Sequence, residues 1–218
     1  MKTTFIFDFD YTLADSSRGV YECTNYALRA MGEASCGWEE CCSRIGLPLN
    51  EIFNGLTGKI DAEREAEFFR LFTERADQVM ASNTELFAGV PALIDYLERR
   101  GLAAGILSTK FGYRIRQILA PHGLADKFSP IIGGEDVTNL KPDPEGLRQF
   151  LLITSTPAEQ AVMVGDSLTD AETALRGGVD FVAVLSGKTV AGQFKKYTPL
   201  AILGSVNDIP EFYESLSE

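Results

Sequence analysis

Histidine is nearly absent from this sequence of 218 residues, in which His122 is the only one. It stands between Pro121 and Gly123, a context typical of a helix end, so a Ser-His-Asp hydrolase is not indicated. Four cysteines are present, at positions 23, 36, 41 and 42, but none has C-x-x-C spacing. A zinc site is therefore not expected, and we interpret the thiols as reduced, in a cytoplasmic protein.

The chain also lacks an excess of positive charge and any long apolar run. Its 20 basic residues stand against 31 acidic ones, which gives a net charge of −11. A protein this acidic repels nucleic acid and anionic membranes. No apolar run approaches the roughly 20 residues of a membrane-spanning helix. Residues 1–4 lead directly into strand-like sequence, so we expect no signal peptide, no membrane partner and no nucleic-acid partner.

Short apolar runs that alternate with amphipathic helical patterns are what the sequence does contain. With 45% hydrophobic residues, the chain can bury a large core. The apolar runs are continuous, which is typical of parallel strands covered on both faces. We expect them at 3–9, 103–109, 130–132, 161–165 and 181–185, with 201–203 as a candidate edge strand. Helical patterns lie between them, so the sequence predicts a doubly wound α/β fold.

Residues 16–85 break this rhythm, because they contain no convincing strand. The stretch is too long for a simple crossover between two strands. We therefore expect two domains, a core of residues 1–15 and 86–218 and a helical insert of residues 16–85 with Trp38 in its interior. Helices are expected in the insert near 17–31, 37–44, 48–56 and 61–82.

Two pairs of aspartates follow predicted strands. Asp8 and Asp10 lie in DFDYT after the first strand, and Asp166 and Asp170 lie in GDSLTD after the fourth. Ligands bind at these strand ends in open α/β sheets. One acid of the first pair can act as nucleophile and the other as acid/base, while the plainer interpretation is a polar turn. For the second pair the plainer interpretation is a helix cap, which accounts for only one of the two acids.

Hydroxyl and lysine side chains follow other strands of the predicted sheet. Ser108, Thr109 and Lys110 follow the second strand, where hydroxyls and free backbone N–H groups can hold an anion. Lys141 lies in KPDP, where the prolines stiffen the loop, although taken alone it fits a surface lysine. Clustered carboxylates need a cation, and oxygen ligands select a hard ion such as Mg²⁺. The sequence thus predicts Mg²⁺-dependent phosphoryl transfer through a carboxylate nucleophile.

The four motifs, in this order, resemble those of the haloacid dehalogenase-like (HAD) hydrolase superfamily. The helical insert after the first strand resembles the cap of the subgroup that includes phosphoglycolate phosphatase, β-phosphoglucomutase and small pyrophosphatases. One departure is Tyr11, where the family often has glycine. The resemblance implies a Rossmann-like core with strand order 3-2-1-4-5. It also implies an active site between core and cap, at the tips of strands 1, 2 and 4.

The resemblance also implies a role for each motif residue. Asp8 would attack phosphorus and form an aspartyl-phosphate, and Asp10 would protonate the leaving oxygen and then activate water. The Asp8 carboxylate, the Asp10 backbone carbonyl and the Asp166 carboxylate would hold Mg²⁺. Asp170 would position metal-bound water or orient Lys141. The phosphoryl oxygens would be bound by three residues, Ser108, Thr109 and Lys141.

The substrate is the property that the sequence determines least. Arg44 and Asn50 are the first and last residues of RIGLPLN, a loop between two helices of the insert. Arg44 could pair with a substrate carboxylate or second phosphate, and Asn50 could add a hydrogen bond. The alternative is that Arg44 is a solvated cation at a helix end. A helical cap of this size favours a small ligand, so we expect a small phosphorylated metabolite as partner, with phosphoglycolate named first.

Several rival activities remain open at this stage. A β-phosphoglucomutase-like phosphomutase and an inorganic pyrophosphatase would use the same motifs. Asp10 argues against a dehalogenase, since a halide leaves without protonation. A non-catalytic phosphate-binding protein would be expected to lose Asp8 or Asp166, and both are present. The sequence leaves the oligomeric state, monomer or dimer, undecided.

Overall fold

The structure is a computed structural model that describes residues 1–216, and residues 217 and 218 lie outside the described part. The chain folds into two compact units, each with a hydrophobic core of its own. One unit comprises Met1–Ala14 and the chain from Leu86 onwards, and the other comprises Asp15–Glu85. None of the helices in the described part combines the length and apolarity needed to span a bilayer.

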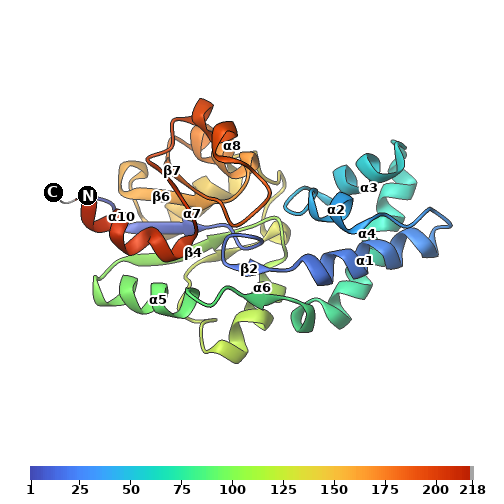
Figure 1. The fold of residues 1–218 in the computed structure, drawn as a ribbon, viewed down its shortest axis with the longest axis horizontal. Helices are drawn as coiled ribbons and strands as arrows, with labels where there is room; N and C mark the ends of the chain where they lie inside the picture. The colour runs from blue at the N-terminus through green and yellow to red at the C-terminus, as the bar shows by residue number, and fades with distance from the viewer. Residues whose placement is uncertain (217–218) are drawn as a thin grey trace. The chain divides into compact units, whose positions relative to one another are not determined.

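A six-stranded parallel sheet forms the centre of the first unit (Figure 1). Its strands, in chain order, are β1 (Thr4–Phe7), β4 (Ala103–Leu107), β5 (Ile131–Ile132), β6 (Ala161–Gly165), β7 (Asp180–Val184) and β8 (Ala201–Leu203). They are arranged β5-β4-β1-β6-β7-β8, and every neighbouring pair is parallel. The predicted order 3-2-1-4-5 is therefore confirmed, and the candidate strand at 201–203 lies at the edge beside β7.

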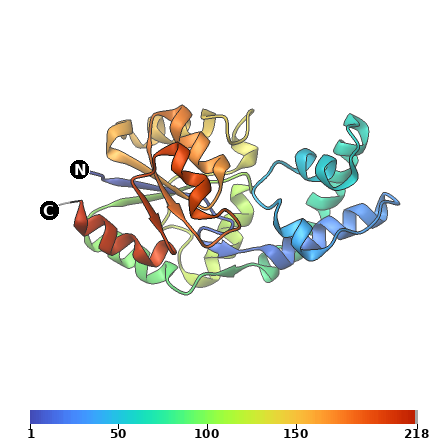
Figure 2. The same cartoon turned by 45° about the horizontal axis from the view of Figure 1, so that its top comes forward.

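Helices cover both faces of this sheet (Figure 2), which explains why its strands are apolar throughout. One face packs against α5 (Val90–Arg99), α6 (Gly112–Leu119) and α10 (Ile209–Ser215). The other packs against α7 (Glu145–Thr154), α8 (Leu168–Gly177) and α9 (Ala191–Phe194).

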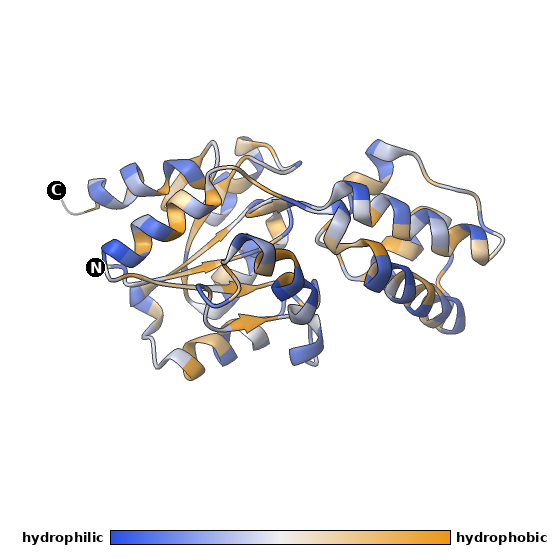
Figure 3. Ribbon diagram, turned by 90° about the horizontal axis from the view of Figure 1, so that it is seen from below, coloured by the Kyte–Doolittle hydropathy of each residue, from blue (hydrophilic) through white to orange (hydrophobic). Residues whose placement is uncertain are grey.

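Side chains of β1 alternate between the two layers, because successive residues of a strand point to opposite faces. Phe5 and Phe7 join the first cluster and Ile6 joins the second. The strands are accordingly among the most hydrophobic segments in Figure 3.

Four helices make up most of the second unit, α1 (Ser17–Ala30), α2 (Trp38–Cys42), α3 (Leu49–Thr57) and α4 (Ala62–Val79). Helix α4 begins where the Asp61 carboxylate accepts hydrogen bonds from the N–H groups of Glu63 and Arg64. Fully buried side chains, among them Leu28, Phe53 and Phe68, form the core of this unit.

Trp38 is not the interior residue that the sequence suggested. Its side chain is 41% exposed, and its indole ring lies edge-on against the Tyr21 ring. The short helix α2 buries Cys41 and Cys42 instead. A large apolar side chain at the start of a helix can rest on a neighbouring ring without entering the core.

Two short strands, β2 (Ala14–Asp15) and β3 (Glu85–Leu86), pair with each other where the chain passes between the units. The pairing continues in the first unit, where the Phe87 N–H donates to the Leu13 carbonyl at 3.0 Å. Short 3₁₀ turns complete the described chain, at Ala81–Asn83, Ala120–His122, Gly134–Asp136, Ala158–Gln160, Lys195–Tyr197 and Val206–Asp208. His122 thus lies in the turn that follows α6, as its sequence context predicts.

Candidate functional site

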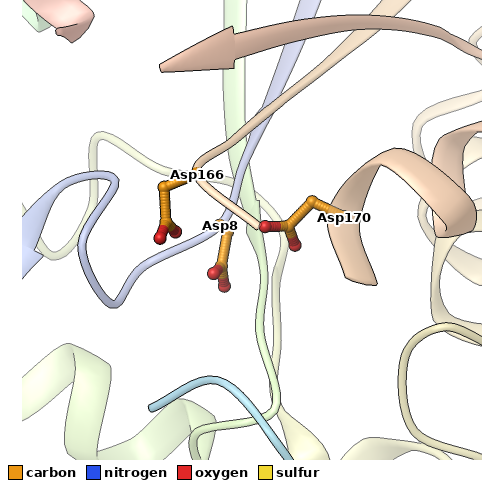
Figure 4. Close-up of side chains that lie close together, drawn as sticks. All are labelled: Asp8, Asp166 and Asp170. Atoms are coloured by element: carbon orange, nitrogen blue, oxygen red, sulfur yellow. The ribbon is translucent and has the colours of Figure 1, made fainter. Parts of the chain in front are cut away.

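Three aspartate carboxylates lie together at the carboxyl edge of the sheet (Figure 4). Asp8 and Asp166 are the first residues after the neighbouring strands β1 and β6, whose register pairs Phe7 with Val164. Asp170 lies in the first turn of α8. One oxygen of each carboxylate lies within 4.8 Å of the others, and all three residues are buried.

The start of α8 fixes Asp170. The Ser167 hydroxyl accepts a hydrogen bond from the Asp170 N–H at 3.2 Å. In return, Asp170 Oδ2 accepts from the Ser167 N–H at 3.1 Å and from its hydroxyl at 2.6 Å. This capping box satisfies backbone groups at the helix N-terminus and uses one oxygen of Asp170, which leaves Oδ1 for another partner.

Lys141 supplies that partner and is not a surface lysine. Its Nζ lies 2.6 Å from Asp170 Oδ1 and 2.9 Å from Asp8 Oδ1. The Lys141 side chain is 5% exposed, so its charge is compensated by these two carboxylates rather than by water.

Burial shifts the ionisation of this cluster. It raises the pKa of Asp8 from 3.8 to about 6, although Lys141 lowers that pKa and Asp170 raises it further. Burial also raises the pKa of Asp166 well above its ordinary value, with the charges of Asp170 and Asp8 adding to the effect. For Lys141 burial lowers the pKa, but the two carboxylates outweigh it, so the pKa lies above its ordinary value.

Asp10 has a different partner, Lys110, which the sequence placed in the candidate anion-binding segment after the second strand without a role of its own. Lys110 Nζ lies 3.3 Å from Asp10 Oδ1, and the two side chains are 6% and 7% exposed. The sequence carried one signal for it, because Lys110 follows the predicted anion-binding Ser108 by two residues.

Ser108 and Thr109 stand at the same sheet edge as Asp8. Ser108 is the first residue after β4, which is hydrogen-bonded to β1 in a register that pairs Ile106 with Phe7. Ser108 is buried and Thr109 half-buried. The Ser108 hydroxyl accepts a hydrogen bond from the Lys110 N–H at 3.3 Å, which shapes the loop into a tight turn.

Thr12 and the loop after β7 support the cluster, and the sequence interpretation missed both. The Thr12 hydroxyl donates to Asp166 Oδ1 at 3.2 Å. A Cβ at Gly187 would lie 1.8 Å from Asp166 Oδ2, so only glycine fits beside that carboxylate. The signal available was a Ser-Gly pair directly after a predicted strand.

The backbone at Tyr11 has a conformation that favours glycine. Its φ of 60° lies in the left-handed region, which is unfavourable for a bulky residue. Hydrogen bonds hold it there: its N–H donates to the Ala14 carbonyl at 2.7 Å, and its carbonyl accepts from the Ser186 hydroxyl at 2.5 Å.

Arg44 and Asn50 belong to the helical unit. The Arg44 guanidinium donates to the carbonyls of Glu40 at 3.0 Å and Gly55 at 2.9 Å, so it links α2 to α3. Asn50 is exposed in the first turn of α3. Substrate recognition by these two residues stays a prediction.

The cluster in the first unit fits a hard divalent cation. All of its donors are carboxylate oxygens, and one oxygen from each of the three buried aspartates lies within 4.8 Å of the others. With all four acids ionised, the carboxylates of Asp8, Asp10, Asp166 and Asp170 and the ammonium groups of Lys110 and Lys141 carry a formal charge of −2. One divalent cation would neutralise it.

Comparison with known proteins identifies the family of this chain. The sequence profile of the haloacid dehalogenase-like hydrolases matches residues 5–184, so this chain belongs to that family, as its motifs predicted. A phosphoglycolate phosphatase of Cereibacter sphaeroides is 32% identical over 186 residues, 84% of each chain. The pyrophosphatase PpaX of Oceanobacillus iheyensis is 27% identical over 206 residues, 94% of each chain.

A solved structure also shares the fold. The crystal structure of a haloacid dehalogenase-like hydrolase from Bacteroides fragilis superposes with a TM-score of 0.93 at 39% identity. The match covers 96% of this chain and all of the other. The α/β core and the helical unit are therefore both present in a relative of known structure.

Proposed function

We propose that this chain is a Mg²⁺-dependent phosphatase that hydrolyses a small phosphomonoester through an aspartyl-phosphate on Asp8. The observation that carries the proposal is the buried Lys141, whose Nζ lies 2.9 Å from Asp8 Oδ1. This places a fixed positive charge beside the attacking carboxylate. Phosphoryl transfer depends mainly on positioning and charge stabilisation, and the relatives' names support the same class of reaction.

The two half-reactions use Asp8 and Asp10 in turn. A carboxylate oxygen of Asp8 attacks phosphorus, the bond to the ester oxygen breaks, and Asp10 gives its proton to the leaving oxygen. Asp10 then takes a proton from water, whose oxygen attacks the phosphorus of the aspartyl-phosphate. The bond from phosphorus to Asp8 breaks, inorganic phosphate leaves, and Asp10 is protonated as it was at the start.

Asp8, Asp166 and the backbone carbonyl of Asp10 are the groups that would hold Mg²⁺. The bound ion would supply positive charge to a cluster whose acids are otherwise difficult to ionise together. Asp170 has one oxygen on Ser167 and the other on Lys141, which favours its role in orienting Lys141. Ser108, Thr109 and Lys141 would bind the phosphoryl oxygens.

Phosphoglycolate is the first candidate substrate, supported by the name of the Cereibacter sphaeroides relative. Inorganic pyrophosphate is the second, supported by the name of the Oceanobacillus iheyensis relative, which covers more of the chain at lower identity. The net charge of −11 supports a small phosphorylated metabolite as partner rather than nucleic acid.

Phosphate release from a panel of phosphorylated compounds tests the proposal. The panel holds p-nitrophenyl phosphate, phosphoglycolate and pyrophosphate, with isomerisation of a sugar 1-phosphate as the assay for a mutase. We expect Mg²⁺-dependent hydrolysis that EDTA abolishes and added Mg²⁺ restores. Asp8→Asn should leave essentially no turnover, whereas Asp126→Asn, which changes an exposed acid, should match the wild type.

Three results would contradict the proposal. Full activity in metal-free buffer would exclude the metal requirement, and activity of Asp8→Asn near that of the wild type would exclude the covalent mechanism. Isomerisation faster than hydrolysis would assign the chain to the mutases instead. Phosphoglycolate is excluded as the substrate if it is turned over no better than p-nitrophenyl phosphate.

A further inference from the structure

We propose that Lys110 is a positioning residue, which holds the Asp10 carboxylate in the orientation needed for its two proton transfers. The inference rests on the proposed function, because it assigns a partner to the acid/base of that reaction. Lys110 Nζ lies 3.3 Å from Asp10 Oδ1, and both side chains are almost completely buried. A charge pair of this kind is retained at a cost in desolvation, which favours a functional reason for it.

The backbone of Lys110 is fixed on both sides. Its N–H donates to the Ser108 hydroxyl at 3.3 Å, and its carbonyl accepts from the Gly134 N–H at 3.2 Å. The two loops approach so closely that a Cβ at Gly134 would lie 2.5 Å from the Thr109 carbonyl oxygen. The lysine side chain therefore extends from a rigid base toward Asp10.

Each acid of the site except Asp166 pairs with one of two lysines. Lys141 pairs with Asp8 and Asp170, and Lys110 pairs with Asp10. An ammonium group at Oδ1 restricts the rotation of the Asp10 carboxylate, which keeps one orientation toward the leaving group and water. Loss of that ammonium group removes one of the contacts that orient the Asp10 carboxylate. A displacement of about 1 Å in a reacting group can cost roughly 10²-fold in rate.

The competing interpretation is that Lys110 contacts the phosphoryl group itself. The two roles differ in how they depend on the leaving group. A residue that acts through Asp10 matters most when the leaving oxygen needs a proton, as in an alkyl phosphate. A residue that binds the phosphoryl oxygens matters equally for every ester, because that group is the same in all of them.

The test compares Lys110→Met and Lys110→Gln with Asp10→Asn in pre-steady-state kinetics. The substrates are p-nitrophenyl phosphate, whose leaving group needs little protonation, and an alkyl phosphate that the wild type hydrolyses. With p-nitrophenyl phosphate we expect a burst of about one p-nitrophenolate per enzyme, followed by a steady rate that is lower by roughly 10²-fold. With the alkyl phosphate we expect no burst and a larger loss.

Two further variants complete the comparison. Lys110→Arg keeps the positive charge and should recover part of the steady rate that Lys110→Met loses. If Lys110 had only a structural role, the steady rate would not depend on its charge. Lys127→Met removes a lysine that pairs with Glu98 on the surface, and should match the wild type. If Lys110→Met does not fold, Lys110→Gln and Lys110→Arg supply the same comparison, with thermal unfolding as the check on folding.

Equal losses on the two substrates, with the burst abolished, would overturn the inference in favour of direct phosphoryl binding. Unchanged kinetics in both Lys110→Met and Lys110→Gln would overturn it as well. Neither result would affect the proposed function, which depends on Asp8→Asn and on the metal requirement. Conversely, an active Asp8→Asn enzyme would remove the proposed function and the inference together.

Discussion

Asp170 joins the N-terminus of α8 to the ammonium group of Lys141. Its Oδ2 accepts hydrogen bonds from Ser167, and its Oδ1 lies 2.6 Å from Lys141 Nζ. The same Nζ lies 2.9 Å from Asp8 Oδ1. A residue one turn into a helix thus positions the charge that stands beside the proposed nucleophile.

Asp170 and Lys141 should therefore behave as a unit in mutagenesis. Lys141→Ala should lower kcat by roughly 10²–10³, by analogy with the loss of one oxyanion donor. Asp170→Asn should lower kcat about 10–100-fold, as loss of a supporting partner does in metal sites. Because Asp170 acts through Lys141, the double variant should lose much less than the product of the two effects. Steady-state kinetics on p-nitrophenyl phosphate with Mg²⁺ at saturation measure this. Fully multiplicative losses would show that the two residues act independently.

The raised pKa values predict how Mg²⁺ binding depends on pH. Asp8 has a pKa of about 6 in the folded chain against an ordinary 3.8, because of burial and the neighbouring acids. The folded state therefore binds this proton more tightly than the unfolded state. As the pH rises from about 4 to about 6, the metal-free protein loses stability through this group, and above that range the loss is constant.

Protons and Mg²⁺ compete for the same carboxylates, so the stabilisation by Mg²⁺ should grow across that pH range. At 100 times its Kd, a ligand stabilises by about 2.7 kcal/mol, which corresponds to a rise in Tm of roughly 5–10 °C for a chain of this size. We expect such a rise above pH 7 and little at pH 5. Thermal unfolding with and without Mg²⁺ measures it, with Asp166→Asn expected to reduce the shift and Asp126→Asn to preserve it. A Mg²⁺ effect that is independent of pH would contradict the ionisation described here.

Gly187 offers a way to disturb Asp166 without changing any charge. Since a Cβ there would lie 1.8 Å from Asp166 Oδ2, Gly187→Ala must displace the carboxylate or the loop. We expect the Mg²⁺ concentration for half-maximal activity to rise about tenfold or more, as for other changes next to metal ligands. Gly192→Ala is the matched control, because a Cβ there meets nothing within 4 Å. Equal Mg²⁺ dependence of the two variants would show that the close approach at Gly187 has no functional consequence.

The strands and the aspartate cluster could be predicted from local patterns in the sequence, whereas the strand order followed from the resemblance to the haloacid dehalogenase-like hydrolases. Continuous apolar runs marked the central strands, and Asp8 and Asp166 directly follow two of them. Parallel strands then bring their carboxyl ends to one edge, so the meeting of the two acids needed no knowledge of side-chain packing.

The supporting residues could not be predicted in this way. The pairing of Lys110 with Asp10 and the close approach of Gly187 to Asp166 depend on how loops fold back over the sheet edge. Exposure along a helix was also difficult to predict: Phe68 and Phe72 are buried in α4, whereas Phe69, in the same apolar stretch, is 44% exposed. Helices α9 and α10 are shorter than the periodic patterns by which a sequence indicates a helix, so the sequence carries little signal for them.

Substitution of Arg44 can show whether the helical unit recognises the substrate. Its guanidinium donates to the carbonyls of Glu40 and Gly55, so Arg44→Ala removes bonds that join α2 to α3. With about 1–2 kcal/mol for the lost hydrogen bonds, Tm should fall by roughly 2–8 °C. Arg18→Ala, which breaks an exposed ion pair with Glu85, is the control and should leave Tm almost unchanged.

The same variants, with Asn50→Ala, then separate stability from recognition. Asn50 is exposed, so its removal should leave Tm unchanged, and any effect on KM reports on substrate contact alone. KM is measured for phosphoglycolate and for p-nitrophenyl phosphate, which lacks the carboxylate. If Arg44 only joins the two helices, Arg44→Ala lowers Tm and leaves the ratio of the two KM values unchanged. A selective rise in KM for phosphoglycolate would instead show that the guanidinium binds the substrate carboxylate, since that charge is what distinguishes the two esters.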